Sequence, residues 1–318
     1  MNADLLLSNL TNPTLLFFVL GIVATVVKSD LEVPAQTVKF ISLYLLFSIG
    51  FNGGQELAHQ GITAEILRSL AFGVGIALVI PLYVFFLLKN KLGAENAGAV
   101  AATYGSVSAV TFVAATAFLE SKQLRMSGHM VAVMALMEAP AIIVGVTLMR
   151  KWQKKKTETE GLGKVIRHSF TNSSVLIILG SLLIGFVADT KQAQGIRPFT
   201  TDIFKGFLAI FLLEMGMLTA NRIRSCLNYG ALMVGFAILV PLFNGCAVAV
   251  LSQFITDDVS NRFVFAVLAA SASYIAVPAA MRLAAPEADP GLYIPMALGV
   301  TFPLNITVGM PVYMAIVQ

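Results

Sequence analysis

Charged residues are scarce in this chain, and cysteine is nearly absent. Asp, Glu, Lys and Arg make up 12% of the 318 residues, whereas a soluble domain usually carries about 25%. Together with a hydrophobic content of 57%, this scarcity argues against a water-soluble fold. Two cysteines cannot build a disulfide framework or a metal cluster, so we interpret Cys226 and Cys246 as packing residues.

Apolar stretches long enough to cross a bilayer recur along the whole chain. At 1.5 Å per residue, about 20 helical residues span a hydrocarbon core about 30 Å thick. The sequence predicts an all-α integral membrane protein of ten transmembrane helices. These spans are residues 13–29, 36–52, 66–88, 95–118, 129–150, 171–188, 203–220, 230–252, 261–282 and 291–316. Because the N-terminus lacks the positive region of a secretory signal, we expect the first span to be retained.

The basic residues are divided unequally between the two sets of loops. The loops that follow odd-numbered spans hold 14 of the 21 Lys and Arg residues, and the N-terminus with the remaining loops holds 7. Under the positive-inside rule, the richer set faces the cytoplasm. We therefore expect a multi-pass protein of the cell (inner) membrane with both termini outside and residues 150–168 inside. The net charge of +4 reflects these loops and does not indicate a nucleic-acid partner.

The two halves of the chain repeat one another. Residues 75–83 (GIALVIPLY) match residues 235–243 (GFAILVPLF), and residues 99–110 (AVAATYGSVSAV) match residues 266–277 (AVLAASASYIAV). A weaker match aligns residues 46–50 (LFSIG) with residues 212–216 (LLEMG). These matches pair span 2 with span 7, span 3 with span 8 and span 4 with span 9.

Because each copy has an odd number of spans, the second copy crosses the membrane in the opposite orientation to the first. The sequence thus predicts two inverted five-helix repeats, an arrangement common in secondary transporters, whose substrate sites lie where the repeats meet. We place the first repeat at residues 1–155, a cytoplasmic linker at 156–168 and the second repeat at 169–318.

Spans 4 and 9 carry matching runs of small and hydroxylic residues. Residues 103–111 read TYGSVSAVT, and residues 270–278 read ASASYIAVP. Backbone at membrane depth can leave helical geometry only where it is buried in protein or lines a wet cavity. We predict that both helices are interrupted here, with Pro278 in the first turn of a new half-helix and Thr111 at the equivalent place. The alternative is that small residues merely allow close helix packing.

Two interrupted helices would bring two half-helix N-termini together near the bilayer centre. Each N-terminus carries roughly half a positive charge and free N–H donors. No Lys or Arg lies near the breaks, and Arg282 lies at the far end of span 9. The pattern therefore predicts an anion site that needs no cationic side chain.

Two polar side chains lie deep in spans 5 and 10. Glu138 is about ten residues from either end of its span, which places it close to the midplane. An acidic residue at that depth indicates a functional site, and we interpret it as a cation ligand, because hard cations prefer carboxylate and carbonyl oxygens. A protonated glutamic acid bonded to a neighbouring helix is the alternative. Asn305 offers an uncharged oxygen at a similar depth, and Glu214 in span 7 suits a gate residue or a hydrogen-bond partner equally.

The remaining polar residues give no catalytic signature. His59, His129 and His168 fall at span ends or in loops, so we interpret each as solvated surface. The sequence contains no zincin pair, phosphate loop, nucleophile elbow or paired carboxylates in an extramembrane domain. We therefore do not expect an enzyme, and membrane-embedded catalysis is the weaker alternative.

Several of these segments resemble a known family. Residues 269–278 (AASASYIAVP), 299–305 (GVTFPLN) and 308–313 (VGMPVY) closely resemble the sodium-dependent bicarbonate transporters known from cyanobacteria. In the first half, Gly105, Val107, Ser108, Thr111, residues 119–122 (LESK) and residues 138–140 (EAP) are similar to the residues of that family. The resemblance covers nearly the whole chain.

The resemblance implies a core domain of spans 3–5 and 8–10 that moves against a gate domain of spans 1–2 and 6–7. It also implies a homotrimer in the lipid bilayer, bicarbonate and sodium as ligands, sodium as the coupling ion, and no other cofactor. Carried over position by position, the anion would be held by Gly105, Ser106, Ser108, Thr111, Ser273 and Tyr274. Sodium would be held by Glu138, Ser271, Thr301 and Asn305.

The chain also departs from the family pattern. A serine-glycine-serine-threonine run reads SAVT at residues 108–111, a triple serine reads SAS at residues 271–273, and an expected aspartate is Glu138. The short central linker counts against the family's nucleotide-binding PII-like regulatory partner. The prediction is a sodium-coupled symporter that takes up bicarbonate or a similar small anion by alternating access. An anion channel, a transporter of another small carboxylate, and a substrate sensor in the same fold are the alternatives.

Overall fold

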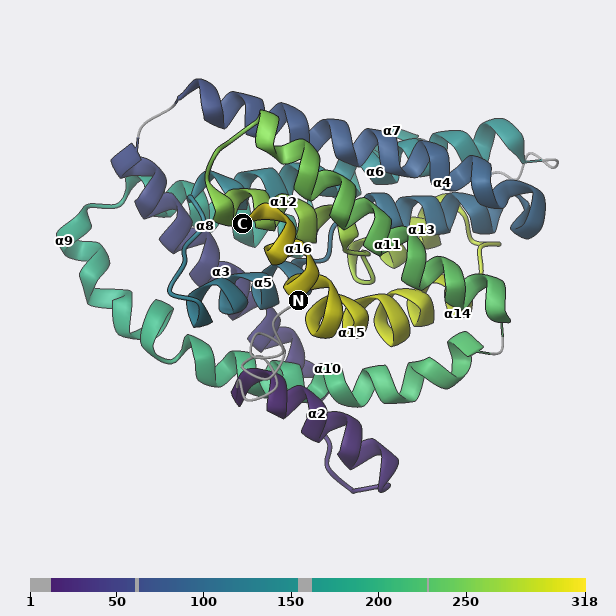
Figure 1. Ribbon diagram of the computed structural model, residues 1–318, viewed down its shortest axis with the longest axis horizontal. Helices are drawn as coiled ribbons and strands as arrows, with labels where there is room; N and C mark the ends of the chain where they lie inside the picture. Colours follow the sequence, from purple (N-terminus) through teal and green to yellow (C-terminus); the bar gives the residue numbers. More distant parts are fainter. Residues whose placement is uncertain (1–12, 61–62, 154–161, 228) are drawn as a thin grey trace.

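The part of the chain that can be described is helical throughout. A computed structural model describes residues 13–60, 63–153, 162–227 and 229–318, and within these ranges it contains helices and no β-strand (Figure 1). The first residues of the first predicted repeat lie outside these ranges, as do residues 156–161 of the predicted linker. The prediction of an all-helical protein is confirmed for the described residues.

Several helical segments have the length and composition of membrane spans. Five of them are long and apolar enough to cross a bilayer, namely Ala64–Ser121, His129–Trp152, Pro198–Ile223, Ala231–Phe254 and Pro290–Val317. Shorter apolar helices cover Leu16–Val26, Ser173–Val187 and Val259–Ala270. Within the described ranges, these helices support a multi-pass membrane protein.

The longest helix, α4 (Ala64–Gly105), is a hairpin. Gly93 is its one non-helical residue, with φ 79° and ψ 168°, a conformation that glycine adopts readily because it has no Cβ. Gly93 lies midway in sequence between Pro81 and Gly105, and a Cβ on Gly105 would lie only 2.5 Å from Cδ of Pro81. The two arms therefore run back along each other. They correspond to predicted span 3 and the first part of predicted span 4.

Helix α4 forms a first group of helices together with α5 (Ala109–Ser121) and α6 (His129–Trp152). Helix α4 packs along α6. The backbones come close at two glycines, since a Cβ on Gly145 would lie 2.8 Å from the carbonyl oxygen of Gly98. Small residues at such a contact allow close van der Waals packing, which is what holds helices together in a bilayer.

The second group runs from Ala231 to the C-terminus. It comprises α11 (Ala231–Leu251), the 3₁₀ turn η3 (Ser252–Phe254), α12 (Val259–Ala270), α13 (Ala276–Ala284), α14 (Pro290–Pro295), η4 (Met296–Thr301), α15 (Phe302–Leu304), η5 (Asn305–Gly309) and α16 (Met310–Val317). The last five form one helical path in which η4 and η5 are π-helical. Helix α12 packs against α5, α11 and α16, which joins this group to the first.

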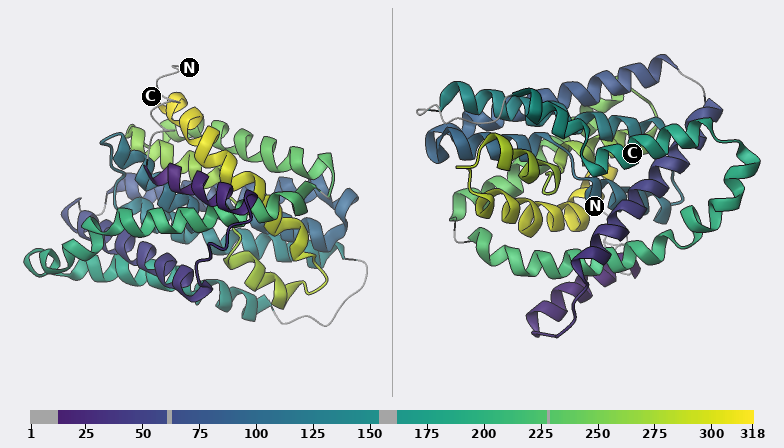
Figure 2. Two further views of the ribbon diagram at one scale, coloured as in Figure 1. Left: turned by 90° about the horizontal axis from the view of Figure 1, so that it is seen from below. Right: turned by 180° about the vertical axis from the view of Figure 1, so that it is seen from behind.

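The third group consists of α2 (Pro13–Val26), α3 (Ala35–Gln60), α7 (Leu162–Phe170), α8 (Ser173–Val187), the short α9 (Thr190–Ala193), η1 (Gln194–Ile196), η2 (Pro198–Asp202) and α10 (Phe204–Leu227). Helix α2 packs on α10, and α3 packs on α8. In Figure 1, α9 and α10 follow the left and lower edge of the molecule, and α3 runs diagonally inside them. Helix α2 extends beyond the rest there and in the right-hand view of Figure 2.

The outer faces of the third group are apolar. Helix α8 exposes Leu176, Leu183, Ile184 and Val187, of which Val187 is 74% exposed. Helix α2 exposes a similar row that ends at Val26. Large contiguous apolar surfaces of this kind are rare on proteins that face water, and they suit contact with hydrocarbon.

We expect Gly54→Ala to destabilise the protein. A Cβ at Gly54 of α3 would lie 2.1 Å from the carbonyl oxygen of Leu182 on α8, so the helices must separate. Such overpacking costs about 1–3 kcal/mol. Gly180→Ala on α8 is the matched control, because its Cβ would meet nothing within 4 Å. Thermal unfolding of the purified protein in detergent compares the two, and equal stability would contradict the close α3–α8 contact.

Candidate functional site

The first helix break lies between α4 and α5. Helix α4 ends at Gly105, Ser106 is extended with φ −84° and ψ 167°, and α5 begins at Ala109. Ser108 caps the new helix, since its hydroxyl oxygen accepts a hydrogen bond of 3.2 Å from the amide of Thr111. The chain is therefore interrupted within the run of small and hydroxylic residues where the sequence predicts it.

The second break lies between α12 and α13. Helix α12 ends at Ala270, and Ser271 is extended with φ −80° and ψ 167°, which repeats the conformation of Ser106. Helix α13 begins at Ala276 without a side-chain cap. Pro278 is its third residue, as Thr111 is the third residue of α5, so the two positions that the sequence match equates are structurally equivalent.

The two breaks are bonded directly to each other. The amide of Ser108 donates a 3.0 Å hydrogen bond to the hydroxyl oxygen of Ser271. The amide of Ser273 donates a 2.8 Å hydrogen bond to the carbonyl oxygen of Thr103, in the last turn of α4. Backbone groups released by an interrupted helix need partners in a buried setting, and each break supplies them to the other.

The predicted anion residues surround this junction. Ser106, Ser108, Thr111 and Ser273 are each at most 3% exposed, and Gly105 is buried against Pro81. Tyr274 is partly buried, and its hydroxyl reaches the side chain of Ser108 and the sulfur of Met215 on α10. The structure thus brings these six residues together at one place where two half-helices begin.

Glu138 lies beside the first break. It is on α6, is 6% exposed, and its carbonyl oxygen accepts a 3.3 Å hydrogen bond from the hydroxyl of Ser106. Among the described residues, none forms a hydrogen bond or an ion pair with its carboxyl group. Burying a carboxyl group without a partner is costly. The position of Glu138 therefore indicates that its carboxyl group pairs with a ligand.

The other predicted cation ligands lie on the side of the second half. Asn305 donates a 2.7 Å hydrogen bond from Nδ2 to the carbonyl oxygen of Ala270, the last residue of α12, and its Oδ1 accepts one of 3.1 Å from Tyr313. Ser271 donates to the carbonyl oxygen of Leu268. These bonds brace the second break.

Thr301 makes a separate connection between the halves. Its hydroxyl donates a 2.8 Å hydrogen bond to the carbonyl oxygen of Ala237, so it accepts the 2.9 Å hydrogen bond from the hydroxyl of Tyr104. No hydrogen bond joins the side chain of Glu138 to Ser271, Thr301 or Asn305 in the part of the chain described. The backbone of Glu138 is bonded to the first break, Ser271 and Asn305 are bonded at the second, and Thr301 contacts α11 and Tyr104 at the end of α4.

Three residues at the junction were not foreseen as site residues. Tyr104 and Tyr313 orient Thr301 and Asn305, and both lie in segments that the sequence already marks as unusual. The hydroxyl of Thr103 is fully buried with no partner among the described residues. Thr103 lies in the run of residues 103–111, and in the sequence only its depth in the span distinguishes it as a candidate site residue.

One interpretation from the sequence is wrong. His129 is not solvated surface, because it is only 3% exposed and both ring nitrogens lack a partner among the described residues. Close by in the chain, Ser127 exchanges hydrogen bonds with Asn261 of α12, which ties the start of α6 to the second half. His59 is exposed as expected, and the side chain of His168 lies outside the described residues.

An all-helical, multi-pass membrane protein with two paired helix breaks in its interior has the architecture of a membrane transport protein. Comparison with family models gives the particular family. Residues 13–318, nearly the full chain, match the Na⁺-dependent bicarbonate transporter superfamily, and the chain belongs to that family. The resemblance inferred from its motifs is confirmed. No curated protein matches the chain.

We expect Ser271→Ala to destabilise the protein more than Ser121→Ala. The first change leaves the buried amide of Ser108 without its acceptor, which costs about 1–3 kcal/mol. Ser121 is the matched control, because its hydroxyl bonds only to the carbonyl oxygen of Phe118 within its own helix. Unfolding in detergent by heat or denaturant measures both. If the two variants lose equal stability, the bond between the breaks does not hold the junction together.

Proposed function

We propose that this protein is a sodium-coupled symporter that takes up bicarbonate or a similar small anion by alternating access. The pair of mutually bonded helix breaks carries the proposal, since it sets two half-helix N-termini at one buried junction. Membership of the bicarbonate transporter family supports bicarbonate and sodium as the ligands.

The proposed architecture is ten spans in two inverted five-helix repeats. Exchanging the repeats turns span 1 into span 6 and span 2 into span 7. The packing of α2 on α10 then becomes the packing of α8 on α3, and both contacts are present. Both also rest on glycines pressed against a backbone carbonyl, as at Gly216 against Phe18 and at Gly185 against Phe51. The shared conformation of Ser106 and Ser271 is further support.

The proposed division is a core domain of α4–α6 and α11–α16 and a gate domain of α2, α3, α8 and α10. Among the described residues, the contacts between the two sets include the ion pair of Lys205 on α10 with Glu120 on α5. Thr219 of α10 donates to the carbonyl oxygen of Leu298, and Tyr274 reaches Met215. The core would carry the ligands past the gate, which is a common mode of alternating access.

The anion would bind at the junction through Gly105, Ser106, Ser108, Thr111, Ser273 and Tyr274. First-turn amides of α5 and α13 have no acceptor inside their own helices, and both helix dipoles add positive potential. Hydroxyl groups complete the shell, and the unpartnered hydroxyl of Thr103 extends it. A small oxyanion suits this site, because it accepts several hydrogen bonds in a small volume.

Sodium would bind through Glu138, with Ser271, Thr301 and Asn305 supplying further oxygen atoms. Sodium is a hard cation and prefers oxygen ligands. A cation beside the first break raises the positive potential at the anion site, so each ligand raises the affinity of the other by the same factor. No other cofactor is proposed.

The proposed setting is the cell (inner) membrane, with both termini outside and residues 150–168 in the cytoplasm. The apolar outer faces of α2 and α8 offer surface for lipid and for the neighbouring subunits of a homotrimer. The described part of the linker includes α7, whose Val165 is fully buried against the protein. A PII-like regulatory partner would have to bind at this cytoplasmic side.

We expect Glu138→Gln to abolish the sodium dependence of bicarbonate uptake. The amide keeps the shape of the side chain but cannot balance the charge of a bound cation. Radiolabelled bicarbonate uptake into proteoliposomes, with and without an inward sodium gradient, measures the effect. Without sodium, the initial rate of uptake by wild type should fall at least about tenfold, whereas the rate of the variant should stay the same with and without sodium.

The control for this experiment is Glu32→Gln, an exposed carboxylate between α2 and α3. It should leave uptake and its sodium dependence unchanged. Sodium-independent uptake by wild type, or a Glu138→Gln variant that still responds to sodium, would refute sodium coupling. Saturable uptake with counterflow distinguishes a carrier from an anion channel.

A further inference from the structure

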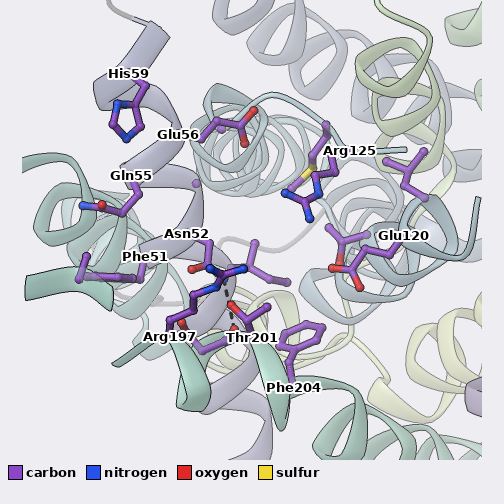
Figure 3. A pocket seen from close by; sticks show the side chains of 18 of the residues that line it. Phe51, Asn52, Gln55, Glu56, His59, Glu120, Arg125, Arg197, Thr201 and Phe204 are labelled. Carbon is purple, nitrogen blue, oxygen red and sulfur yellow. Dashed lines mark hydrogen bonds between the residues drawn. The ribbon is translucent and has the colours of Figure 1, made fainter. Parts of the chain in front are cut away.

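A pocket separate from the helix breaks lies between the two groups of helices that the proposed function treats as core and gate. It encloses about 640 Å³ (Figure 3). Its walls come from α3, from α5 and the loop before α6, and from the segment that leads through η1 and η2 to α10. These segments are far apart in sequence, so no local motif predicts the pocket.

The pocket is connected to the first break by α5. This half-helix begins at Ala109 at the break, and its residues Thr116 and Leu119 line the pocket. Five residues separate Thr111 from Thr116, which corresponds to about 7.5 Å along a helix axis. The pocket thus lies directly beyond the anion site, at the other end of the same half-helix.

Hydroxyl groups lie at the inner part of the pocket. Thr200 is 1% exposed, and its hydroxyl has no partner among the described residues. Its carbonyl oxygen accepts a 3.2 Å hydrogen bond from Nδ2 of Asn52, which fixes η2 against α3. A buried hydroxyl without a partner is costly, and its position beside a cavity indicates a ligand. Thr116 adds a second hydroxyl, which donates to the carbonyl oxygen of Val113.

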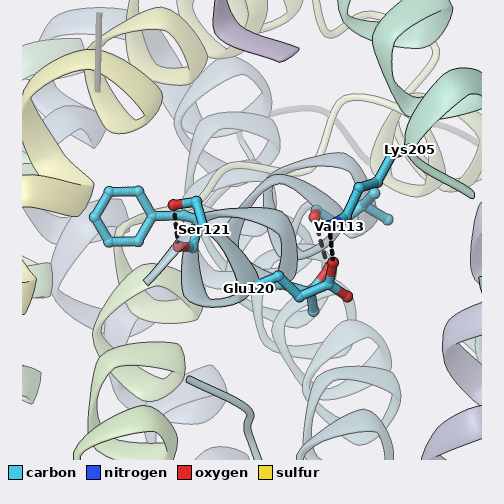
Figure 4. Close-up of polar contacts among 6 residues, drawn as sticks. Val113, Glu120, Ser121 and Lys205 are labelled. Carbon is cyan, nitrogen blue, oxygen red and sulfur yellow. Dashed lines mark hydrogen bonds and ion pairs between the residues drawn. The ribbon is translucent and has the colours of Figure 1, made fainter. Parts of the chain in front are cut away.

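Cationic side chains occupy the outer part. Arg125 and Arg197 extend toward the centre of the pocket in Figure 3, and both are exposed. Of the two acidic residues in the lining, Glu120 pairs with Lys205 of α10 at 3.5 Å (Figure 4), and Glu56 has an interaction of its own. With Lys205 counted, three cationic side chains (Arg125, Arg197 and Lys205) face the two carboxylates of Glu56 and Glu120, which leaves one excess positive charge at the pocket.

We propose that this pocket is a second anion site, an outer vestibule that receives the substrate before it reaches the breaks. Arg125 and Arg197 draw the anion in, and the hydroxyls of Thr200 and Thr116 receive it. The inference rests on the proposed function for the identity of the anion. The three lining segments lie at or next to the loops that hold fewer basic residues. The positive-inside rule places these loops outside the cell, so the vestibule opens to the outside.

Cysteine labelling tests the position of the vestibule without measuring transport. Thr116→Cys is placed in a background in which Cys226 and Cys246 are replaced by alanine, and intact cells are treated with a membrane-impermeant anionic methanethiosulfonate. We expect labelling from outside, slowed at least about threefold by bicarbonate. Ser121→Cys, exposed on α5 outside the pocket, should be labelled at a rate that bicarbonate does not change.

Labelling only after the cytoplasmic side is made accessible, or labelling that bicarbonate does not slow, overturns the vestibule. If Thr116→Cys does not fold, Thr201→Cys replaces it, because this residue is exposed and also lines the pocket. The outcome is independent of sodium coupling. Protection by bicarbonate can therefore stand even where the sodium test on Glu138 fails, and the reverse also holds.

Neutralising the arginines tests their role in capture. We expect Arg125→Gln combined with Arg197→Gln to raise KM for bicarbonate about three- to tenfold at low ionic strength, with Vmax within about twofold of wild type. The difference should shrink at high salt, since screening acts over about 10 Å at 0.1 M. Lys39→Gln combined with Lys151→Gln removes the same charge from exposed sites outside the pocket. An arginine variant that matches this control overturns the proposal.

Discussion

Two unwound stretches of backbone meet inside an apolar helical bundle, and the peptide groups that they release must find partners there. Each stretch satisfies the other: the amide of Ser108 bonds to the hydroxyl of Ser271, and the amide of Ser273 bonds to the carbonyl of Thr103. An unpaired peptide group in a bilayer costs several kcal/mol, which is about the size of a domain's whole stability. Neither break could therefore leave these groups without the partners that the other break provides. The junction is therefore a property of both halves together, and its position depends on how they dock.

This dependence explains why the surrounding side chains act as braces. Asn305 holds the last carbonyl of α12 and is itself held by Tyr313, whose ring leaves no room for a Cβ at Gly245. Ser106 holds the backbone of α6 at Glu138. Each break is thus fixed to a helix of its own half, and the two breaks are bonded to each other. The proposed coupling of sodium to anion binding uses this connection.

Sequence reasoning located the breaks because they depend on local chemistry: small and hydroxylic residues in register, with Pro278 in the first turn of a half-helix. It also predicted an all-helical membrane protein, for which five long apolar helices and several shorter ones are found in the described residues, and Gly93 rather than a polar loop marks the turn inside α4. It did not find what depends on docking. His129 is buried although it begins a helix, Tyr104 meets Thr301 from the other half, and the pocket is built by the separate segments 49–59, 116–128 and 190–204. Hydropathy indicates how deep in the membrane a residue of a helix lies, but it does not indicate which other helix packs against that residue.

The central claim is that one junction binds an anion and a cation that strengthen each other. Equilibrium binding to the purified protein tests it most directly: bicarbonate affinity measured with and without sodium, and sodium affinity measured with and without bicarbonate. The account predicts that each ligand raises the affinity of the other, and by the same factor, as linkage requires. Bicarbonate affinity that does not change with sodium would contradict it.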